Sequence, residues 1–310
     1  MPLRVCWLGS GRMIDTAPFK ALYPFKSNWL DLAGLRYHYL DEGPREAPTV
    51  VMLHGNPTWS FYYRTLIPAV SKQYRVIVPD HMGCGLSDKP QDYPYNLQRH
   101  VQNLEALLDM LDSPNITLVL HDWGGVIGMG YATRYPQRIS SFVIFNTAAF
   151  YLPKLPRRIL WCRSPLLGAV AVRGFNAFAG LAVHQATSQR QRMTAPVKAG
   201  YLAPYNSWHN RIAIHRFVQD IPWEDDHPTR PTLERIEAGL PHFRHHPMLI
   251  IWGADDFCFT ERDFLPQWQE RFPEATTHIL QGAGHYVVED AHERILPLMM
   301  EFLEQQPDPR

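Results

Sequence analysis

The sequence has few cysteines, and they are scattered. Its four cysteines lie far apart, with no CxxC pair and no cysteine–histidine cluster at metal-ligand spacing: Cys6, Cys84, Cys162 and Cys258. Neither a disulfide scaffold nor a zinc site is therefore expected. Isolated thiols of this kind fit a reducing, cytoplasmic setting.

Long apolar runs and an excess of one charge are also absent. No stretch of 18 uninterrupted apolar residues occurs, and the N-terminal "MPLRVCWLGSGRM" has too short an apolar core for a signal peptide. We therefore expect neither export nor a membrane span. Lysine plus arginine and aspartate plus glutamate both number 30, so no electrostatic footprint for nucleic acid is present. The composition, 45% hydrophobic and 12% aromatic, predicts a globular protein that binds a small, uncharged or weakly charged molecule.

Apolar, β-rich runs alternate with segments of helical spacing along most of the chain. Continuous rather than alternating hydrophobicity in the runs predicts strands that are covered on both faces. The predicted strands lie near residues 35–43, 49–55, 74–80, 116–120, 139–146, 248–256 and 277–285. The predicted helices between and after them are 61–72, 96–112 with Asn96 as N-cap, 124–136 and 291–303. This alternation predicts parallel βαβ units.

The alternation of predicted strands and helices stops between residues 148 and 235. This interval contains no clear strand and is rich in Pro, Arg, Trp and Tyr. We interpret this interval as a helical cap inserted above the carboxyl ends of the strands, where open α/β sheets bind ligands. The expected domain organisation is a core of residues 19–147 and 236–310, a cap of 148–235, and an N-terminal arm of 1–18 without periodicity.

The stretch "HDWGG" places a carboxylate, Asp122, at a glycine-flanked turn between a predicted strand and a helix. In α/β-hydrolases such a turn exposes the nucleophile above the sheet, and small residues are needed because the backbone bends tightly. No G-x-S-x-G occurs, so a serine esterase is hard to assemble. An aspartate in this position attacks an electrophilic carbon, displaces a leaving group and becomes an ester, which water must then cleave.

A base and its orienting acid follow in the order that this fold uses. His285 in "GAGHYVVED" comes just after the last predicted strand, which is the position of the base that activates water. The strand near 139–146 ends without Asp or Glu, whereas "MLIIWGADD" ends with Asp255 and Asp256. We prefer Asp256 as the acid because it follows Gly253 by three residues, and we expect Asp255 to be a turn or capping residue. Structural or exposed roles are expected for four other histidines: His54, His121, His245 and His246.

Two further segments supply neutral N–H donors near the predicted nucleophile. The loop "HGNPTW" lends a backbone N–H to an oxyanion hole, and Trp123 lends the other. Asn56 adds a side-chain amide and Trp123 adds an indole N–H. Such donors suit a departing anion, because they bind it without a cation that would pair with the nucleophilic carboxylate.

With these residues in place, the chain resembles the haloalkane dehalogenase family of α/β-hydrolases over residues 20–305. The resemblance implies an α/β-hydrolase fold, with a mostly parallel sheet, helices on both faces and a helical cap, and it implies no cofactor. It assigns Asp122 as nucleophile, His285 as base, Asp256 as acid, and Asn56 with Trp123 as halide ligands. Aspartate at the end of the predicted strand 248–256 together with Asn56 is similar to the family's third subgroup. The predicted reaction is hydrolysis of a haloalkane, with water as co-substrate and halide and a primary alcohol as products.

Three alternatives stay open. The same subgroup includes β-lactone decarboxylases that make long-chain olefins, and the segments "NTAAF", "FNAFAG" and "YLAPYNSWHNRIAIHRFVQDIP" look more like those relatives. The apolar stretch 165–184 would line a channel for an alkyl chain, form a partner-binding surface, or pack on the core.

An epoxide hydrolase would need cap tyrosines, and Tyr151, Tyr201 and Tyr205 are available. A non-catalytic binding protein on the same fold is the last alternative, and a homo-oligomer or a pathway-enzyme partner is left open.

Overall fold

A computed structural model describes residues 14–306, so most of the predicted arm of residues 1–18 lies outside the described residues. Its eight strands form one sheet in the order β1-β2-β4-β3-β5-β6-β7-β8. The strands are β1 (Asn28–Leu32), β2 (Leu35–Glu42), β3 (Thr49–Leu53), β4 (Arg75–Pro79), β5 (Ile116–Leu120), β6 (Ile139–Ile144), β7 (Met248–Gly253) and β8 (Thr276–Leu280). Only the β1–β2 and β2–β4 pairs are antiparallel, so the predicted mostly parallel α/β-hydrolase sheet is confirmed.

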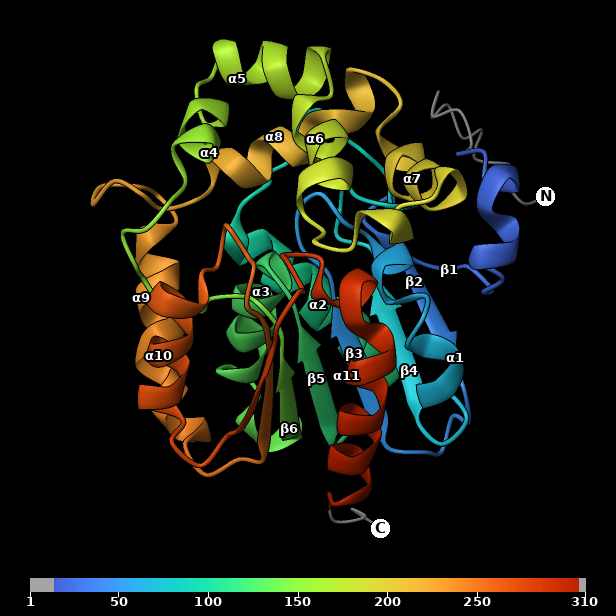
Figure 1. Cartoon of the computed structure of the whole chain (residues 1–310), viewed down its shortest axis with the longest axis vertical. Helices are drawn as coiled ribbons and strands as arrows, with labels where there is room; N and C mark the ends of the chain where they lie inside the picture. Colours follow the sequence, from blue (N-terminus) through green and yellow to red (C-terminus); the bar gives the residue numbers. More distant parts are fainter. Residues whose placement is uncertain (1–13, 307–310) are drawn as a thin grey trace, which may run out of the picture.

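Helices cover both faces of the sheet (Figure 1). The bounds of the core helices are α1 (Ile67–Val70), α2 (Leu97–Leu111), α3 (Trp123–Ala132), α10 (Glu261–Arg271) and α11 (Val287–Glu304). Neighbouring residues of a central strand enter different cores: Val51 packs in the cluster that contains α2, α3 and α10, whereas Val50 packs in the cluster that contains α1 and α11. Burial on both faces explains why the strands are continuously apolar in the sequence.

One local prediction was wrong and two elements were missed. The segment 61–72 contains the 3₁₀ turn η2 (Ser60–Tyr63) and the short α1 instead of one helix. Pro68 explains the break, because in the interior of a longer helix its ring would clash with the preceding turn, whereas the first turn of α1 tolerates it. The antiparallel β1 and the helix α10 carry no strong periodic signal. The predicted N-cap is confirmed, since the side chain of Asn96 accepts a hydrogen bond from the backbone N–H of Arg99 at 2.9 Å.

The interval between β6 and β7 contains helices and no strand; its helices up to residue 219 form the upper part of the molecule in Figure 1, whereas its last helix, 230–239, lies lower, beside the core. Its elements are α4 (Arg157–Cys162), α5 (Leu167–Ala169), the π-helical turn η4 (Val170–Gly174), α6 (Ala177–Gln185), α7 (Ala195–Leu202), α8 (Ile212–Gln219) and α9 (Arg230–Gly239). The expected boundary at residue 235 falls inside α9, which packs against α2 and α3 of the core. We therefore propose that the cap ends before α9.

The register of the parallel strands determines where the site lies. Leu53 of β3 pairs with Leu120 of β5, and Leu120 pairs with Ile144 of β6. The carboxyl ends of these strands therefore lie at one edge of the sheet, beneath the cap. Among the described residues, no single helix is long and apolar enough to cross a bilayer, although the bent pair 167–174 and 177–185, at 64°, passes the same criteria of length and composition.

Candidate active site

Asp122 lies on a sharp turn between β5 and α3, and its backbone is strained, with φ 49° and ψ −127°. Close packing around this turn requires glycine. A Cβ at Gly125 would lie 1.8 Å from the side-chain oxygen of Thr147, and a Cβ at Gly55, in the loop after β3, would lie 2.0 Å from Oδ1 of Asp122. The glycines thus allow two loops to approach the carboxylate, and strain of this kind is typical of functional sites.

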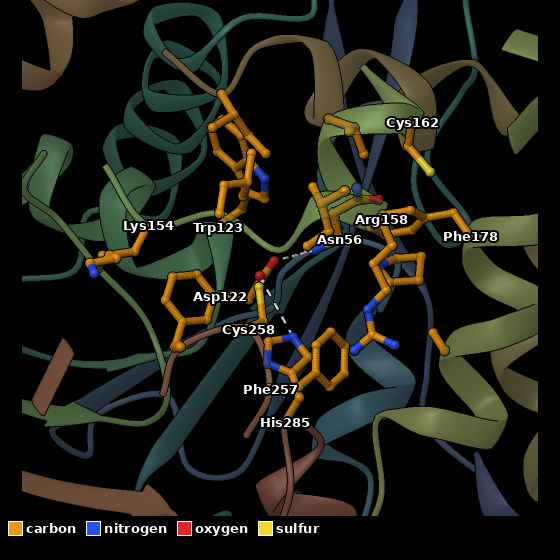
Figure 2. A pocket seen from close by; sticks show the side chains of 18 of the residues that line it. Asn56, Asp122, Trp123, Lys154, Arg158, Cys162, Phe178, Phe257, Cys258 and His285 are labelled. Atoms are coloured by element: carbon orange, nitrogen blue, oxygen red, sulfur yellow. Dashed lines mark hydrogen bonds and ion pairs between the residues drawn. The ribbon is translucent and has the colours of Figure 1, made fainter. Parts of the chain in front are cut away.

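The structure brings together the three residues that the sequence singled out as nucleophile, base and acid. His285 Nε2 lies 3.7 Å from Oδ2 of Asp122, and His285 Nδ1 lies 2.9 Å from Oδ2 of Asp256 (Figure 2 shows the first pair). The other oxygen of Asp256 accepts backbone N–H groups from Cys258 at 2.6 Å and Phe259 at 3.1 Å, so this carboxylate is fixed. A carboxylate on Nδ1 leaves Nε2 free to face Asp122.

The other acid after β7 has a different environment. Asp255 is exposed, and its backbone N–H donates to the carbonyl of Ala283 at 2.9 Å. Asp256 is 3% exposed and is the one that contacts the imidazole. The spacing argument therefore selected the carboxylate that lies beside His285.

Burial and charge act on the two partners in opposite ways. Burial raises the pKa of Asp122 above the ordinary aspartate range, and the nearby His285 and the backbone N–H groups of Trp123 and Asn56 offset part of this rise. Burial alone would lower the pKa of His285, but the adjacent Asp256 carboxylate outweighs it, so the pKa is raised. The imidazole is thus suited to carry a positive charge between two carboxylates.

Asn56 and Trp123 both reach the site, but Asn56 does so in a way that the sequence did not indicate. The backbone N–H of Asn56 donates to Oδ1 of Asp122 at 2.6 Å. Its side-chain Nδ2 donates to the carbonyl of Ile214 in α8 at 3.1 Å, which joins the loop to the cap. Trp123 is half-buried, lines the cavity and lies 5.1 Å, ring to ring, from Phe217. The carboxylate is therefore held by the peptide N–H groups of Asn56 and Trp123.

A cavity between cap and core opens onto Asp122 and His285, and its walls are mostly apolar. The cap contributes Phe178, Leu181 and Ala182 from α6, and the core contributes Val126 from α3. Part of the apolar stretch 165–184 therefore lines a channel, whereas Val172 and Val183 are buried against their surroundings. An apolar cavity of this kind suits an alkyl chain.

Sequence reasoning missed two cations in this cavity, Lys154 and Arg158. Arg158 of α4 lines it, with the guanidinium 3.6 Å from the ring centroid of Phe257 and a 2.6 Å hydrogen bond to Gln185 (Figure 2). The positive charge of Arg158 lowers the pKa of His285, whereas Asp256 raises it, so Arg158 lies within electrostatic range of the site. The neutral donors expected beside Asp122 are thus accompanied by cations elsewhere in the cavity. The only sequence signal was the Arg157–Arg158 pair in the cap.

The remaining histidines and tyrosines that the sequence offered have structural partners. Buried His54 accepts the backbone N–H of His81 at 3.0 Å, and buried His121 lies 2.8 Å from the carbonyl of His285. Of the three cap tyrosines, Tyr151 lines the cavity. The other two bond elsewhere, Tyr201 to Glu289 and Tyr205 to Thr58. A pair of ring-protonating tyrosines, which an epoxide hydrolase would need, is therefore not assembled from these three.

Replacing Asp256 with asparagine is expected to lower the pKa of His285, because the carboxylate that raises it is removed. Hydrolysis of an ester on Asp122 should slow by about 10⁴-fold, the effect of amidating the orienting aspartate in a serine protease triad. The pKa can be measured from the pH dependence of single-turnover ester hydrolysis. Asp255→Asn is the matched control and should leave rate and pKa unchanged; an equal loss in both variants would contradict the assignment.

The rate at which Asp122 forms an ester should increase with pH through the pKa of this residue, because only the carboxylate is a nucleophile. Since burial raises that pKa, the acidic limb should lie above the ordinary aspartate range. His285→Gln removes a charge that lowers the pKa of Asp122, so the limb should move to higher pH. Pre-steady-state rates of adduct formation against pH measure both limbs; coincident limbs would contradict the coupling.

Comparison with known proteins agrees with this geometry. A family model described as the alpha/beta hydrolase fold matches residues 48–291. A cis-3-alkyl-4-alkyloxetan-2-one decarboxylase of Shewanella oneidensis is 48% identical over 94% of this chain and 91% of its own length. Haloalkane dehalogenase 2 of Mycobacterium tuberculosis is 31% identical over 93% of this chain and 98% of its own. The crystal structure of a haloalkane dehalogenase from Agrobacterium tumefaciens aligns with a TM-score of 0.81 and 26% identity, covering 92% of this chain and 99% of that one.

Proposed function

The chain belongs to the alpha/beta hydrolase fold family, and within this family we propose that it decarboxylates a cis-3-alkyl-4-alkyloxetan-2-one, a β-lactone, to an alkene. The observation that carries the proposal is the 48% identity to a decarboxylase of that name over nearly the whole chain. The dehalogenase similarity is 31%. This difference reverses the order of the two expectations from the sequence, in which dehalogenation came first.

The first step is ring opening by Asp122. A carboxylate oxygen attacks C4 of the four-membered ring from the side opposite the ring oxygen, forms a C4–O bond and breaks the C4–O1 bond. The electron pair of that bond stays on O1, which becomes part of a carboxylate attached to C3. No proton is transferred, and relief of ring strain favours the step. The product is an alkyl ester of Asp122 with a carboxylate in the β position.

The second step returns the nucleophile without water. The electrons of the bond between C3 and the carboxylate carbon form the C3=C4 double bond, carbon dioxide departs, and the Asp122 carboxylate leaves C4. Attack inverts C4, and departure of the two groups from opposite sides then gives a cis-alkene from a cis-lactone. Both lactone oxygens end in carbon dioxide, so the cycle neither consumes water nor exchanges the oxygens of Asp122.

In this cycle His285 and Asp256 stabilise the negative charge of Asp122 and do not activate water. The raised pKa of His285 favours an imidazolium 3.7 Å from Asp122, which offsets the burial of the carboxylate and keeps it ionised. The same charge stabilises Asp122 when it departs from C4. A neutral imidazole would instead activate water and cleave the ester, so the protonation state of His285 selects between the two outcomes.

Arg158 supports the decarboxylase proposal, because ring opening creates a carboxylate on the substrate and halide displacement does not. We expect Arg158→Met, which keeps an unbranched apolar stem but removes the guanidinium, to reduce alkene formation from the β-lactone by about tenfold, the contribution of one charge-assisted hydrogen bond. Bromide release from a 1-bromoalkane should change less than threefold. Parallel kcat/KM measurements on both substrates check this, and equal losses on both would contradict a carboxylate-binding role.

The test of the proposed function is side-by-side turnover of a long-chain cis-β-lactone and a 1-bromoalkane. Gas chromatography with mass detection should find one cis-alkene per lactone consumed, with much slower bromide release. Fast bromide release without alkene would overturn the proposal in favour of dehalogenation. Two observations support that second candidate: the 31% identity to a haloalkane dehalogenase, and the neutral N–H donors of Asn56 and Trp123. A β-hydroxy acid from the lactone would instead mean ester hydrolysis.

A further inference from the structure

The outer face of the cap exposes large apolar side chains that the active site does not use. Trp161 in α4 is 74% exposed, Leu166 and Phe175 are each 80% exposed, and Leu167 in α5 is 69% exposed. We call these four residues, together with Val170 at 51%, the cap patch. In Figure 1, α5 lies at the extremity of the molecule farthest from the sheet. Apolar side chains gathered on a protein surface indicate a docking site.

Although the net charge of the chain is zero, its acidic and basic residues are unevenly distributed along the sequence. Residues 148–219 contain no aspartate or glutamate but ten lysines and arginines: Lys154, Arg157, Arg158, Arg163, Arg173, Arg190, Arg192, Lys198, Arg211 and Arg216. Of these, Arg163 and Arg192 form ion pairs, with Glu224 and Glu293; no carboxylate partner is found for the others within residues 14–306. Residues 148–219 are therefore a cationic part of the cap, and the rest of the chain carries the excess of acidic residues.

Cations and apolar side chains lie on the same part of the cap. Arg157 precedes Trp161 by four residues in α4, so both lie on one face of that helix. At the other side of the patch, the guanidinium of Arg173 stacks 4.7 Å from the ring centroid of Trp208, which is itself 48% exposed. Exposed tryptophan, phenylalanine and leucine flanked by arginine are typical of a surface that lies in the headgroup region of a membrane.

From these observations we propose that the cap patch docks on an anionic lipid bilayer. A second copy of the chain is a poor occupant, because a symmetric contact would place the unpaired cations of two caps against each other. Anionic headgroups complement the cations, and the acyl boundary accepts the apolar tips. The segments 167–174 and 177–185, which together are apolar enough to satisfy the length and composition criteria for a span, contain two of the five patch residues, Leu167 and Val170.

The helix α6, which follows the patch in the chain, links the outer surface of the cap to the catalytic cavity. Leu181 of α6 is 52% exposed on the outer side and also lines the cavity, and Phe178 lines it one turn earlier. A β-lactone with two alkyl chains dissolves in a bilayer and hardly in water. Entry at the membrane would deliver it without crossing the aqueous phase; this delivery step rests on the proposed function, whereas docking itself does not.

Vesicle co-sedimentation of the full chain tests the docking. We expect binding to vesicles of phosphatidylglycerol and phosphatidylcholine in equal amounts, loss at high salt, and little binding to phosphatidylcholine alone. Leu166→Ser combined with Phe175→Ser should weaken binding at least about tenfold, because apolar burial is lost. Arg157→Gln should weaken it about fivefold. The control is Met110→Ser, which removes an exposed apolar residue, 47% exposed, from α2 in the core and should have no effect.

Several results would overturn the proposal. These are equal binding to both lipids at all salt concentrations, unchanged binding by the double variant, and no vesicle binding by the wild type. A concentration-dependent dimer that the double variant loses, seen by sedimentation velocity without vesicle binding, would assign the patch to a second copy. Specific association with an acidic protein in place of vesicles would assign it to a protein partner.

Kinetic measurements distinguish delivery of the β-lactone from the membrane from the proposed decarboxylase function. The double variant should turn over β-lactone supplied in neutral detergent micelles at the wild-type rate, because none of its changes touches the cavity. It should be about tenfold slower when the same lactone is supplied in anionic vesicles. Equal rates from vesicles would overturn delivery from the membrane. Absence of alkene in both settings would overturn the proposed function and leave the docking result standing.

Discussion

Asp122→Ala is expected to abolish turnover of both the β-lactone and a 1-bromoalkane, by at least about 10⁴-fold in kcat, because no other described side chain in the cavity can form the ester. The substrate should still bind, since the apolar walls are intact. Turnover by gas chromatography and binding by calorimetry measure the two effects separately.

Folding of this variant should not be impaired. Burial raises the pKa of Asp122, which means that the folded protein holds this carboxylate at a cost. Removing it should leave the melting temperature unchanged or raise it, as is common when a strained functional group is lost. Asp255→Ala, at the exposed neighbouring acid, is the control and should keep full activity. Turnover by Asp122→Ala at a tenth of the wild-type rate would refute covalent catalysis by this residue.

The central sheet and the triad could be predicted from the sequence because local signals determine them. Continuous apolar runs identify buried strands whatever their partners, and the order of Asp122, Asp256 and His285 at successive strand ends places them at one sheet edge. The sheet edge that holds β1 was missed, because Asn28–Leu32 alternates between half-buried and exposed residues and offers no apolar run.

The cap was harder, because its geometry depends on contacts between residues distant in sequence. Arg158 enters the cavity because its guanidinium stacks on Phe257, about a hundred residues later in the chain. The side-chain amide of Asn56 donates to the carbonyl of Ile214 in α8, so an amide that was expected to bind a leaving group forms a contact with the cap. Neither contact has a local pattern. The preference for dehalogenation over decarboxylation rested on residues that both reactions use.

His285→Phe separates the two chemistries. Without a base, an alkyl ester formed from a 1-bromoalkane cannot be hydrolysed, so one equivalent of bromide should be released and the alkyl group should remain on Asp122. Steady-state hydrolysis should fall by about 10³-fold or more. The β-lactone should leave no stable adduct, because its own carboxylate departs, and alkene formation should continue at a rate reduced about tenfold to hundredfold through loss of the imidazolium. Peptide mass spectrometry of the segment that contains Asp122 distinguishes the cases.

The wild-type protein in H₂¹⁸O provides the matching control without a mutation. Ester hydrolysis adds the oxygen of water to the carbonyl carbon of Asp122, so repeated turnover of a bromoalkane should label this residue. Decarboxylation breaks only the bond between C4 and the aspartate oxygen, so lactone turnover should leave Asp122 unlabelled. If ¹⁸O entered Asp122 in proportion to alkene formed, or if His285→Phe accumulated a carboxyalkyl ester from the lactone, the water-independent second step would be wrong. In that case the imidazole would act as a base in alkene formation as well.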